Sequence, residues 1–235
     1  MNEQFLTYRP LPGARLNMAH PLTKGLVGMW LLNEGGYRAM DLSPYGNHGV
    51  LTNFASPARR PFNGLPFDGT DDHINCGNKS ILNIPTGGIT LEVFLKLTVA
   101  LGTFQSFLSK GTIASGLGYA IQKVTTNVVR FLHTDAGAGT VLDTVATLAR
   151  YVDYHIVVTM DVANLAKIYI DASELASGVL NARVSNTQDL IIGARDAGVT
   201  QNWGGTIGLV RIWKDNALSK DNVKWLHAEP YCMFL

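Results

Sequence analysis

The sequence predicts an all-β protein in which antiparallel sheets pack face to face as a sandwich. About a dozen short apolar segments follow one another, and turn residues rather than helices connect nearly all of them. The chain has 24 glycines and nine prolines among 235 residues, a composition suited to short strands and tight turns. In the segment Ile89 to Leu97, alternate residues are apolar, as expected for a strand with one face in a core.

The length is compatible with one large sandwich domain. We expect residues 1–24 to form an extended arm and residues 25–235 to form the sandwich, including a C-terminal helix and an apolar tail. Pro10, Pro12 and Pro21 disfavour helix in the arm. Three interpretations of the arm remain open: a strap lying across the sandwich, a floppy terminus, or a docking arm that inserts into a neighbouring subunit.

Composition argues against several classes of partner. The net charge is +1 and the basic residues are scattered, so no nucleic-acid surface is predicted. No apolar run is long enough to cross a bilayer, so we expect no membrane partner. The N-terminal residues do not resemble a signal peptide, which predicts synthesis in a cytoplasm without an address for secretion. Cys76 and Cys232 are far apart and are predicted to be buried free thiols.

The first half of the chain holds one strand and two turns that organise the prediction. Between Gly25 and Asn33, apolar residues on both faces indicate an interior strand. The first turn covers residues 41–49. The second lies within Leu65 to Gly77, which is interpreted as two short strands around a tight acidic turn, with Asp68-Gly69 allowing a sharp reversal.

The remaining elements follow at short intervals. Beyond the strand Ile89 to Leu97, the expected strands are Phe104 to Ser109, Gly118 to Val124, Val128 to His133, Tyr154 to Met160, Ala166 to Asp171, Leu190 to Ala194 and Thr206 to Trp213. One helix is predicted, with Ser219 as its N-cap and an end near His227, before Pro230. The tail after it is apolar and must be buried on this domain or on a partner.

Five segments, in this order, resemble the laminin G-like jelly roll of the concanavalin A-like lectin/glucanase superfamily. They are residues 25–35, 41–49, 67–74, 167–171 and 206–213 with 217–219. The resemblance implies an antiparallel two-sheet jelly roll. Gly208-Leu209 stand where this family usually carries an acidic pair.

The opening His20 to Gly25 and the ending Trp225 to Phe234 resemble stand-alone members encoded by tailed bacteriophages and prophages. This resemblance implies a place on the virion surface, as a decoration or attachment protein. The partners would then be capsid or tail proteins, or further copies of the chain, held through the N-terminal arm and the C-terminal tail. Such a protein is made in the host cytoplasm and released by lysis, which agrees with the lack of a signal peptide.

A calcium site is predicted at the two turns. Asp41, Asn47, Asp71 and Asp72 supply the hard oxygen ligands that Ca²⁺ prefers. Carboxylates in such turns also stabilise the turn itself by hydrogen-bonding its backbone, and Asp68 is assigned to that role. Both interpretations of the four residues remain open.

A glycan-binding surface is predicted around Trp203. Its indole would serve as a stacking platform, with Gln201 and Asn202 hydrogen-bonding sugar hydroxyls. A loop tryptophan also packs between sheets, so core packing is the alternative. Trp30 and Trp213 lie in predicted strands and are assigned to the core.

No catalytic residue is predicted. Glycan hydrolysis needs two carboxylates on one strand face, and the five glutamates are isolated from one another. The histidines show no metal-ligand spacing, and His155 is assigned to the core. We therefore expect a non-catalytic virion surface protein that touches cell-surface glycans through its rim loops. A calcium-assisted lectin is the alternative, and a glycan hydrolase is a third.

Overall fold

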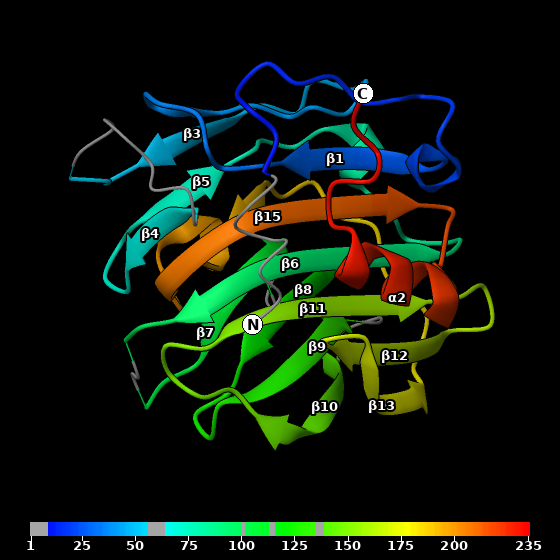
Figure 1. Cartoon of the computed structure of the whole chain (residues 1–235). Helices are drawn as coiled ribbons and strands as arrows, with labels where there is room; N and C mark the ends of the chain where they lie inside the picture. Colours follow the sequence, from blue (N-terminus) through cyan, green and yellow to red (C-terminus); the bar gives the residue numbers. More distant parts are fainter. Residues whose placement is uncertain (1–8, 56–63, 100–101, 113–115, 135–138) are drawn as a thin grey trace.

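The computed structural model describes residues 9–55, 64–99, 102–112, 116–134 and 139–235. Within these ranges, fifteen strands form two antiparallel sheets stacked face to face (Figure 1). The same ranges hold one α-helix, near the C-terminus, and no helix long and apolar enough to cross a lipid bilayer. The predicted jelly-roll sandwich with one short C-terminal helix is confirmed.

The first sheet has seven strands among the described residues, and β15 pairs with three of the others. In order they are β1 (Leu26–Trp30), β15 (Gly204–Lys214), β6 (Ile89–Leu97), β11 (Asp153–Met160), β12 (Leu165–Ile170) and β13 (Ser173–Val179), with β4 (Leu65–Asp68) also paired to β15. Because β15 is eleven residues long, it pairs with both β1 and β4 along one edge and with β6 along the other.

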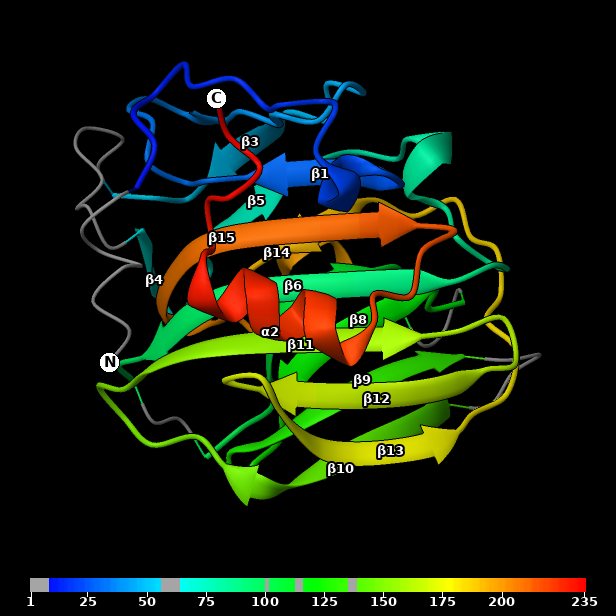
Figure 2. The same ribbon diagram turned by 45° about the vertical axis from the view of Figure 1, so that its right-hand side comes forward.

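The second sheet has eight strands in the described ranges. Their order is β10 (Gly139–Thr147), β9 (Val128–Thr134), β8 (Tyr119–Lys123), β7 (Gln105–Lys110), β14 (Leu190–Ile192), β5 (His73–Asn75), β3 (Gly49–Thr52) and β2 (Arg38–Ala39). The main hydrophobic core lies between the two sheets and includes Trp30 and all five apolar residues predicted on one face of β6. The opposite face of β6 is covered as well, because α2 (Lys220–Ala228) packs in front of it (Figure 2).

A buried charge network fixes the helix and the tail to this outer face. Glu92 accepts a hydrogen bond from Arg211 Nη2 at 2.7 Å, and its Oε1 lies 2.7 Å from His155 Nε2. Burial alone would raise the pKa of Glu92, but the charges of Arg211 and His155 outweigh it and hold the pKa below its ordinary value. Arg211 also donates to the carbonyl of Pro230 at 3.0 Å, and His155 Nδ1 lies 3.3 Å from His227 Nδ1. The network therefore ties three strands, β6, β11 and β15, to the C-terminal segment.

The helix has the predicted start. Ser219 Oγ accepts a hydrogen bond from the Asn222 N–H at 3.2 Å, and the last helical residue is Ala228, one beyond the expected end. Leu218 and Val223 are both buried in a second apolar cluster, where they pack as a hydrophobic staple. Trp213 lies in the same cluster and is fully buried, as predicted.

The described part of the arm runs beside the C-terminal tail. The Asn17 N–H donates to the Met233 carbonyl at 2.8 Å, and the Leu235 N–H donates to the Arg15 carbonyl at 3.0 Å. Met233 is fully buried, so the apolar tail packs on its own domain. Residues 9–24 therefore lie as a strap, and residues 1–8 fall outside the described ranges. The two cysteines are free thiols, of which Cys76 is buried and Cys232 is half-buried.

Most of the predicted strands agree with the observed ones to within two residues at either end, and β6 has the predicted bounds. Four strands were not predicted: the short strands β2 and β3, which flank the turn of residues 41–49, and the longer strands β10 and β13. Both β10 and β13 lie at the edge of their sheets, where outward side chains such as Val145 are exposed and no apolar alternation marks a core face.

The acidic turn does not close a hairpin. Two short strands flank it as predicted, but β4 pairs with β15 in the first sheet while β5 pairs with β14 and β3 in the second. The chain therefore crosses from one sheet to the other at this turn. That crossing places its carboxylates at the rim of the sandwich.

Candidate functional site

An open pocket lies where the acidic turn meets the loop that leads into β15. Asp68, the last residue of β4, pairs with Gly204, the first residue of β15. The pocket beside them has a volume of about 460 Å³. It is lined by Gly69, Thr103, Phe104, Val199, Thr200, Gln201 and Asn202. We call it the rim pocket.

Three carboxylates gather on the turn next to the rim pocket. Oxygen atoms of Asp68, Asp71 and Asp72 lie within 4.8 Å of one another. Asp68 Oδ1 accepts hydrogen bonds from the N–H groups of Thr70 (2.7 Å) and Asp71 (3.4 Å). Asp72 Oδ2 accepts from the Asp68 N–H at 2.9 Å. The predicted role of Asp68 in the turn is thus present, and Asp68 also belongs to the cluster.

The cluster concentrates negative charge. Burial raises the pKa of Asp72, and the charges of Asp68 and Asp71 add to the rise, while the hydrogen bond from the Asp68 N–H opposes it. Ca²⁺ holds oxygen atoms at roughly 2.4 Å, so oxygens bound to one ion lie up to about 5 Å apart. The spacing of the three carboxylates therefore fits a calcium ion, which would also relieve their mutual repulsion.

Asp41 and Asn47 do not join this cluster, so the predicted four-residue calcium site is corrected. The Asp41 carboxylate accepts hydrogen bonds from the N–H groups of Met29 (2.8 Å), Ser43 (2.9 Å) and Asn47 (2.7 Å), and from the Ser43 hydroxyl (2.7 Å). The Asn47 side chain donates to the Val27 carbonyl at 2.7 Å. These groups organise the turn of residues 41–49 beside β1.

Trp203 is fully buried, so it offers no face to a sugar. Its indole packs edge-to-face on Phe107 of β7, with ring centroids 4.8 Å apart, inside the core between the sheets. The stacking-platform interpretation is therefore wrong, and the core alternative is confirmed. The indole direction depends on long-range packing rather than on the loop sequence around it.

Gln201 and Asn202, by contrast, do line the rim pocket. The Ser106 N–H donates to the Gln201 carbonyl at 2.7 Å, and Asn202 Nδ2 donates to the Gly198 carbonyl at 3.1 Å. The aromatic residue at this pocket is Phe104, which is 36% exposed and was predicted only as the start of a strand. The Arg130 guanidinium lies over its ring, 5.8 Å from the centroid.

His73 connects the acidic turn to the opposite wall of the pocket. Its Nδ1 lies 2.9 Å from the Asp71 carbonyl oxygen. Its ring packs so closely under Gly198 that a Cβ at that position would come within 2.3 Å of His73 Nε2. Gly198 also has φ +91°, which disfavours any side chain. A movement of the acidic turn would therefore displace His73 and Gly198, and through them Asn202.

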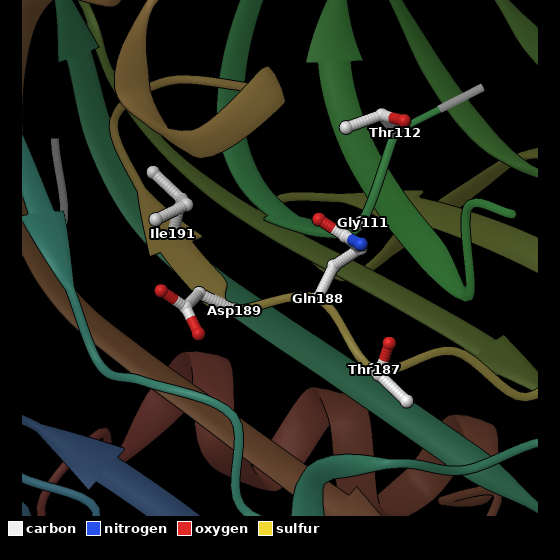
Figure 3. A pocket seen from close by; sticks show the side chains of 6 residues that line it. All are labelled: Gly111, Thr112, Thr187, Gln188, Asp189 and Ile191. Carbon is white, nitrogen blue, oxygen red and sulfur yellow. The ribbon is translucent and has the colours of Figure 1, made fainter. Parts of the chain in front are cut away.

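A smaller hollow opens at the other end of β14 (Figure 3). Its volume is about 110 Å³, a quarter of that of the rim pocket. Asp189 accepts a hydrogen bond from Asn75 Nδ2 there, at 2.8 Å. The nearby Lys110 ammonium is enclosed by the side-chain oxygens of Asn78 (3.0 Å) and Asn186 (3.1 Å), and burial lowers its pKa to about 8. This hollow is too small for a sugar ring with its hydroxyls.

A family model described as the concanavalin A-like lectin/glucanases superfamily matches residues 68–224. The chain belongs to this superfamily. The matched segment begins at the acidic turn and contains every residue that lines the rim pocket. No curated protein sequence matches the chain.

Solved structures share the fold at low sequence identity. Trypanosoma rangeli sialidase in complex with sialic acid matches 99% of this chain with a TM-score of 0.67 and 17% identity, and this chain covers 37% of that one. The binding domain of Paraclostridial Mosquitocidal Protein 1 matches 88% with a TM-score of 0.65 and 15% identity, over 52% of its chain. Ruminococcus gnavus IT-sialidase CBM40, bound to α2,3-sialyllactose, matches 60% with a TM-score of 0.53 and 18% identity, over 83% of its chain. The chain therefore spans about a third of the sialidase, and the likeness establishes the fold.

Proposed function

We propose that the chain is a non-catalytic carbohydrate-recognition protein whose rim pocket binds glycans. The observation that carries this proposal is the convergence of Gln201, Asn202 and the partly exposed Phe104 on one open pocket. Side-chain amides donate to and accept from sugar hydroxyls, and an aromatic ring packs on the C–H face of a sugar. The superfamily fold and a glycan-bound neighbour, the CBM40 above, support the same function.

Calcium would shape this pocket rather than contact the sugar. Asp68, Asp71 and Asp72 would hold the ion, which supplies positive charge to a turn crowded with carboxylates. Fixing the turn would also fix His73, because its ring nitrogen lies next to the Asp71 carbonyl. Gly198 rests on that ring and accepts the Asn202 hydrogen bond, so the polar wall would be held in place.

The arrangement of the acids favours binding over hydrolysis. A glycosidase places its two carboxylates on either side of the scissile bond. Here the three carboxylates share one five-residue turn, and the residues that line the facing wall, 103–104 and 199–202, include no acid. Incubation of the purified chain with labelled glycans is expected to release no product by mass spectrometry. Product release that disappears in the Asp71→Asn variant would identify an enzyme instead.

A glycan array with and without EDTA tests the binding function. We expect the native chain to bind a subset of glycans and to bind them more weakly after chelation. The double variant Gln201→Ala, Asn202→Ala is expected to lose binding at least about tenfold, since it removes two hydrogen-bonding groups. The matched control Gln188→Ala alters the small hollow and is expected to bind normally. A blank array for the native chain under both conditions would refute the proposal.

We further propose that the setting of this binding is the surface of a tailed-phage virion. The support is the likeness of the opening and closing segments to phage-encoded members, together with the apolar residues exposed near both termini. Leu11 is 75% exposed, Met18 56% and Leu235 85%, and these side chains offer a docking surface for a capsid or tail protein.

Incorporation into phage particles tests this setting. The triple variant Leu11→Ser, Met18→Ser, Leu235→Ser is expected to fold but to be missing from purified particles in quantitative mass spectrometry. Val162→Ser is the matched control, because Val162 is 82% exposed in the turn between β11 and β12, away from the termini. Equal incorporation of the native chain and the triple variant would show that these residues near the termini are not the docking surface.

A further inference from the structure

A second pocket lies at the opposite rim of the sandwich. The strand β15 begins beside the rim pocket at Gly204 and ends at Lys214, ten residues further on, which corresponds to about 33 Å. At this far end is a pocket of about 490 Å³. It is lined by Lys24, Gly25, Val27, Tyr45, Ile81, Lys214, Asp215 and Asn216. We call it the far pocket.

Tyr45 gives the far pocket an aromatic surface that is open to solvent. Its side chain is 51% exposed, whereas Trp203 is fully buried. The turn that carries Tyr45 is held by the buried Asp41 carboxylate, and the Tyr45 N–H donates to the Ser43 hydroxyl at 3.4 Å. The ring is therefore presented from a fixed backbone, which lowers the entropy lost when a ligand stacks on it.

Two lysines stand beside this aromatic residue on segments that are locked together. The Lys214 N–H donates to the Gly25 carbonyl at 2.8 Å, and Asn216 Nδ2 donates to the Lys24 carbonyl at 2.8 Å. A Cβ at Gly25 would lie 2.7 Å from the Lys214 carbonyl oxygen, so the two segments meet backbone to backbone. The backbone therefore holds both lysines at the same pocket.

The far pocket carries an excess of positive charge. Among the described residues that line it, Asp215 is the one acid. The Asp215 carboxylate lies against Gly87, where a built Cβ would come within 2.1 Å of Oδ1. Two lysines and one carboxylate therefore line the pocket, and that carboxylate lies against Gly87. A ligand with both an anionic group and an apolar ring face matches this lining.

We propose that the far pocket binds an acidic saccharide. The sugar ring would stack on Tyr45, and its carboxylate or sulfate would lie between the ammonium groups of Lys24 and Lys214. This site shares no lining residue with the rim pocket, so it stands or falls independently of the glycan-binding function proposed there. The chain would then hold saccharides at both ends of β15.

Titration of the ¹⁵N-labelled full chain tests this second site. The probes are tetragalacturonate, a sulfated carrageenan tetrasaccharide and neutral cellotetraose, each at millimolar concentration. We expect at least one anionic probe to shift the amide signals of Gly25, Gly46 and Asn216, with cellotetraose binding at least about tenfold more weakly. Comparison of the two anionic probes separates a preference for carboxylate from one for sulfate.

Calorimetry of variants separates the contribution of the Tyr45 ring from that of the two lysines. Tyr45→Ala is expected to lower the affinity for the anionic probe about tenfold, whereas Tyr45→Phe, which keeps the ring, should bind the probe normally. The double variant Lys24→Gln, Lys214→Gln is expected to lower this affinity about fivefold or more and to make binding less dependent on salt. Gln188→Ala, which alters the small hollow and neither of the two larger pockets, serves as the control and should leave this affinity unchanged.

Three results would overturn the proposal. The first is an absence of binding by both anionic probes. The second is a set of shifted signals centred on Gly69 and Gly198, which would place the ligand in the rim pocket. The third is affinity that is the same for native chain, Tyr45→Ala and the double lysine variant, which would place the ligand elsewhere.

Discussion

Replacing Arg211 by methionine tests whether the buried charge network holds the outer face of the first sheet. Arg211 and Glu92 both have fully buried side chains, and Arg211 Nε lies 2.5 Å from Glu92 Oε2. The variant leaves Glu92 buried with His155 as its remaining partner and removes the hydrogen bond to the Pro230 carbonyl. We therefore expect both the strand pair and the C-terminal segment to be weakened.

The loss of stability follows from the state of Glu92. Removing one partner of a buried ion pair costs about 3–5 kcal/mol of stability. Because His155 still contacts Glu92 in the variant, we expect a loss near the lower end, about 3 kcal/mol. For a chain of this length, that loss lowers the melting temperature by roughly 6–12 °C. Urea denaturation followed by tryptophan fluorescence would measure it.

The stability difference between the native chain and Arg211→Met should depend on pH. In the native chain the lowered pKa of Glu92 means that its stabilisation is present at neutral pH and is lost as the pH falls through that lowered pKa. In the variant, burial without Arg211 raises the pKa of Glu92, so protonation relieves the buried charge. The stability difference between the two proteins should therefore narrow from pH 7 to pH 5.

The double variant Glu92→Gln, Arg211→Met is the matched control. It removes both charges while glutamine keeps a hydrogen bond to His155, so it should be more stable than Arg211→Met by about 1–2 kcal/mol. A double variant that is less stable than the single one would refute the reasoning. So would a loss in the single variant below about 1 kcal/mol, which is the size expected for an exposed ion pair.

Three further predictions concern single positions. Gly198→Ala should lower the free energy of unfolding by about 1–3 kcal/mol, because its Cβ would press on the His73 ring at a positive φ. Gly178→Ala is the control: its Cβ would lie 3.4 Å from the nearest atom, so the loss should be well under about 1 kcal/mol. Urea denaturation compares the two variants. Ser219→Ala should cost about 1 kcal/mol through loss of the N-cap, seen as a lower melting temperature. Because burial lowers the pKa of Lys110 to about 8, the folded state sheds that proton before the unfolded state, and the native chain should gain stability from pH 8 to pH 10 relative to Lys110→Met in urea titrations. A constant difference between those two proteins across that range would contradict the assignment.

The sequence predicted the strands whose two faces differ or are both buried. In β6 the apolar alternation is local, so its bounds could be read without knowledge of the partners. The strands β10 and β13 have exposed outward residues and a single neighbour each, so pairing rather than pattern creates them. Likewise, no local signal tells that β4 and β5 join different sheets, because each is assigned by its pairing with distant strands.

The candidate sites show the same limit. Asp41 and Asp71 both lie in turns rich in polar residues, but Asp41 is surrounded by N–H donors that include Met29, twelve residues earlier in the chain. That donor comes from β1, which the turn sequence does not reveal. Trp203 turns into the core because Phe107 of the other sheet receives its ring, while its neighbours Gln201 and Asn202 remain at the pocket.

The crossing of the chain between Asp68 and His73 also has a mechanical consequence. These five steps span at most about 18 Å, and stacked sheets lie about 10 Å apart, so the link between the layers has little slack. A force that peels one layer from the other at this end stretches that link at an early stage. An ion bound by its carboxylates would shorten the link further, so the rim would resist separation of the two sheets under tension.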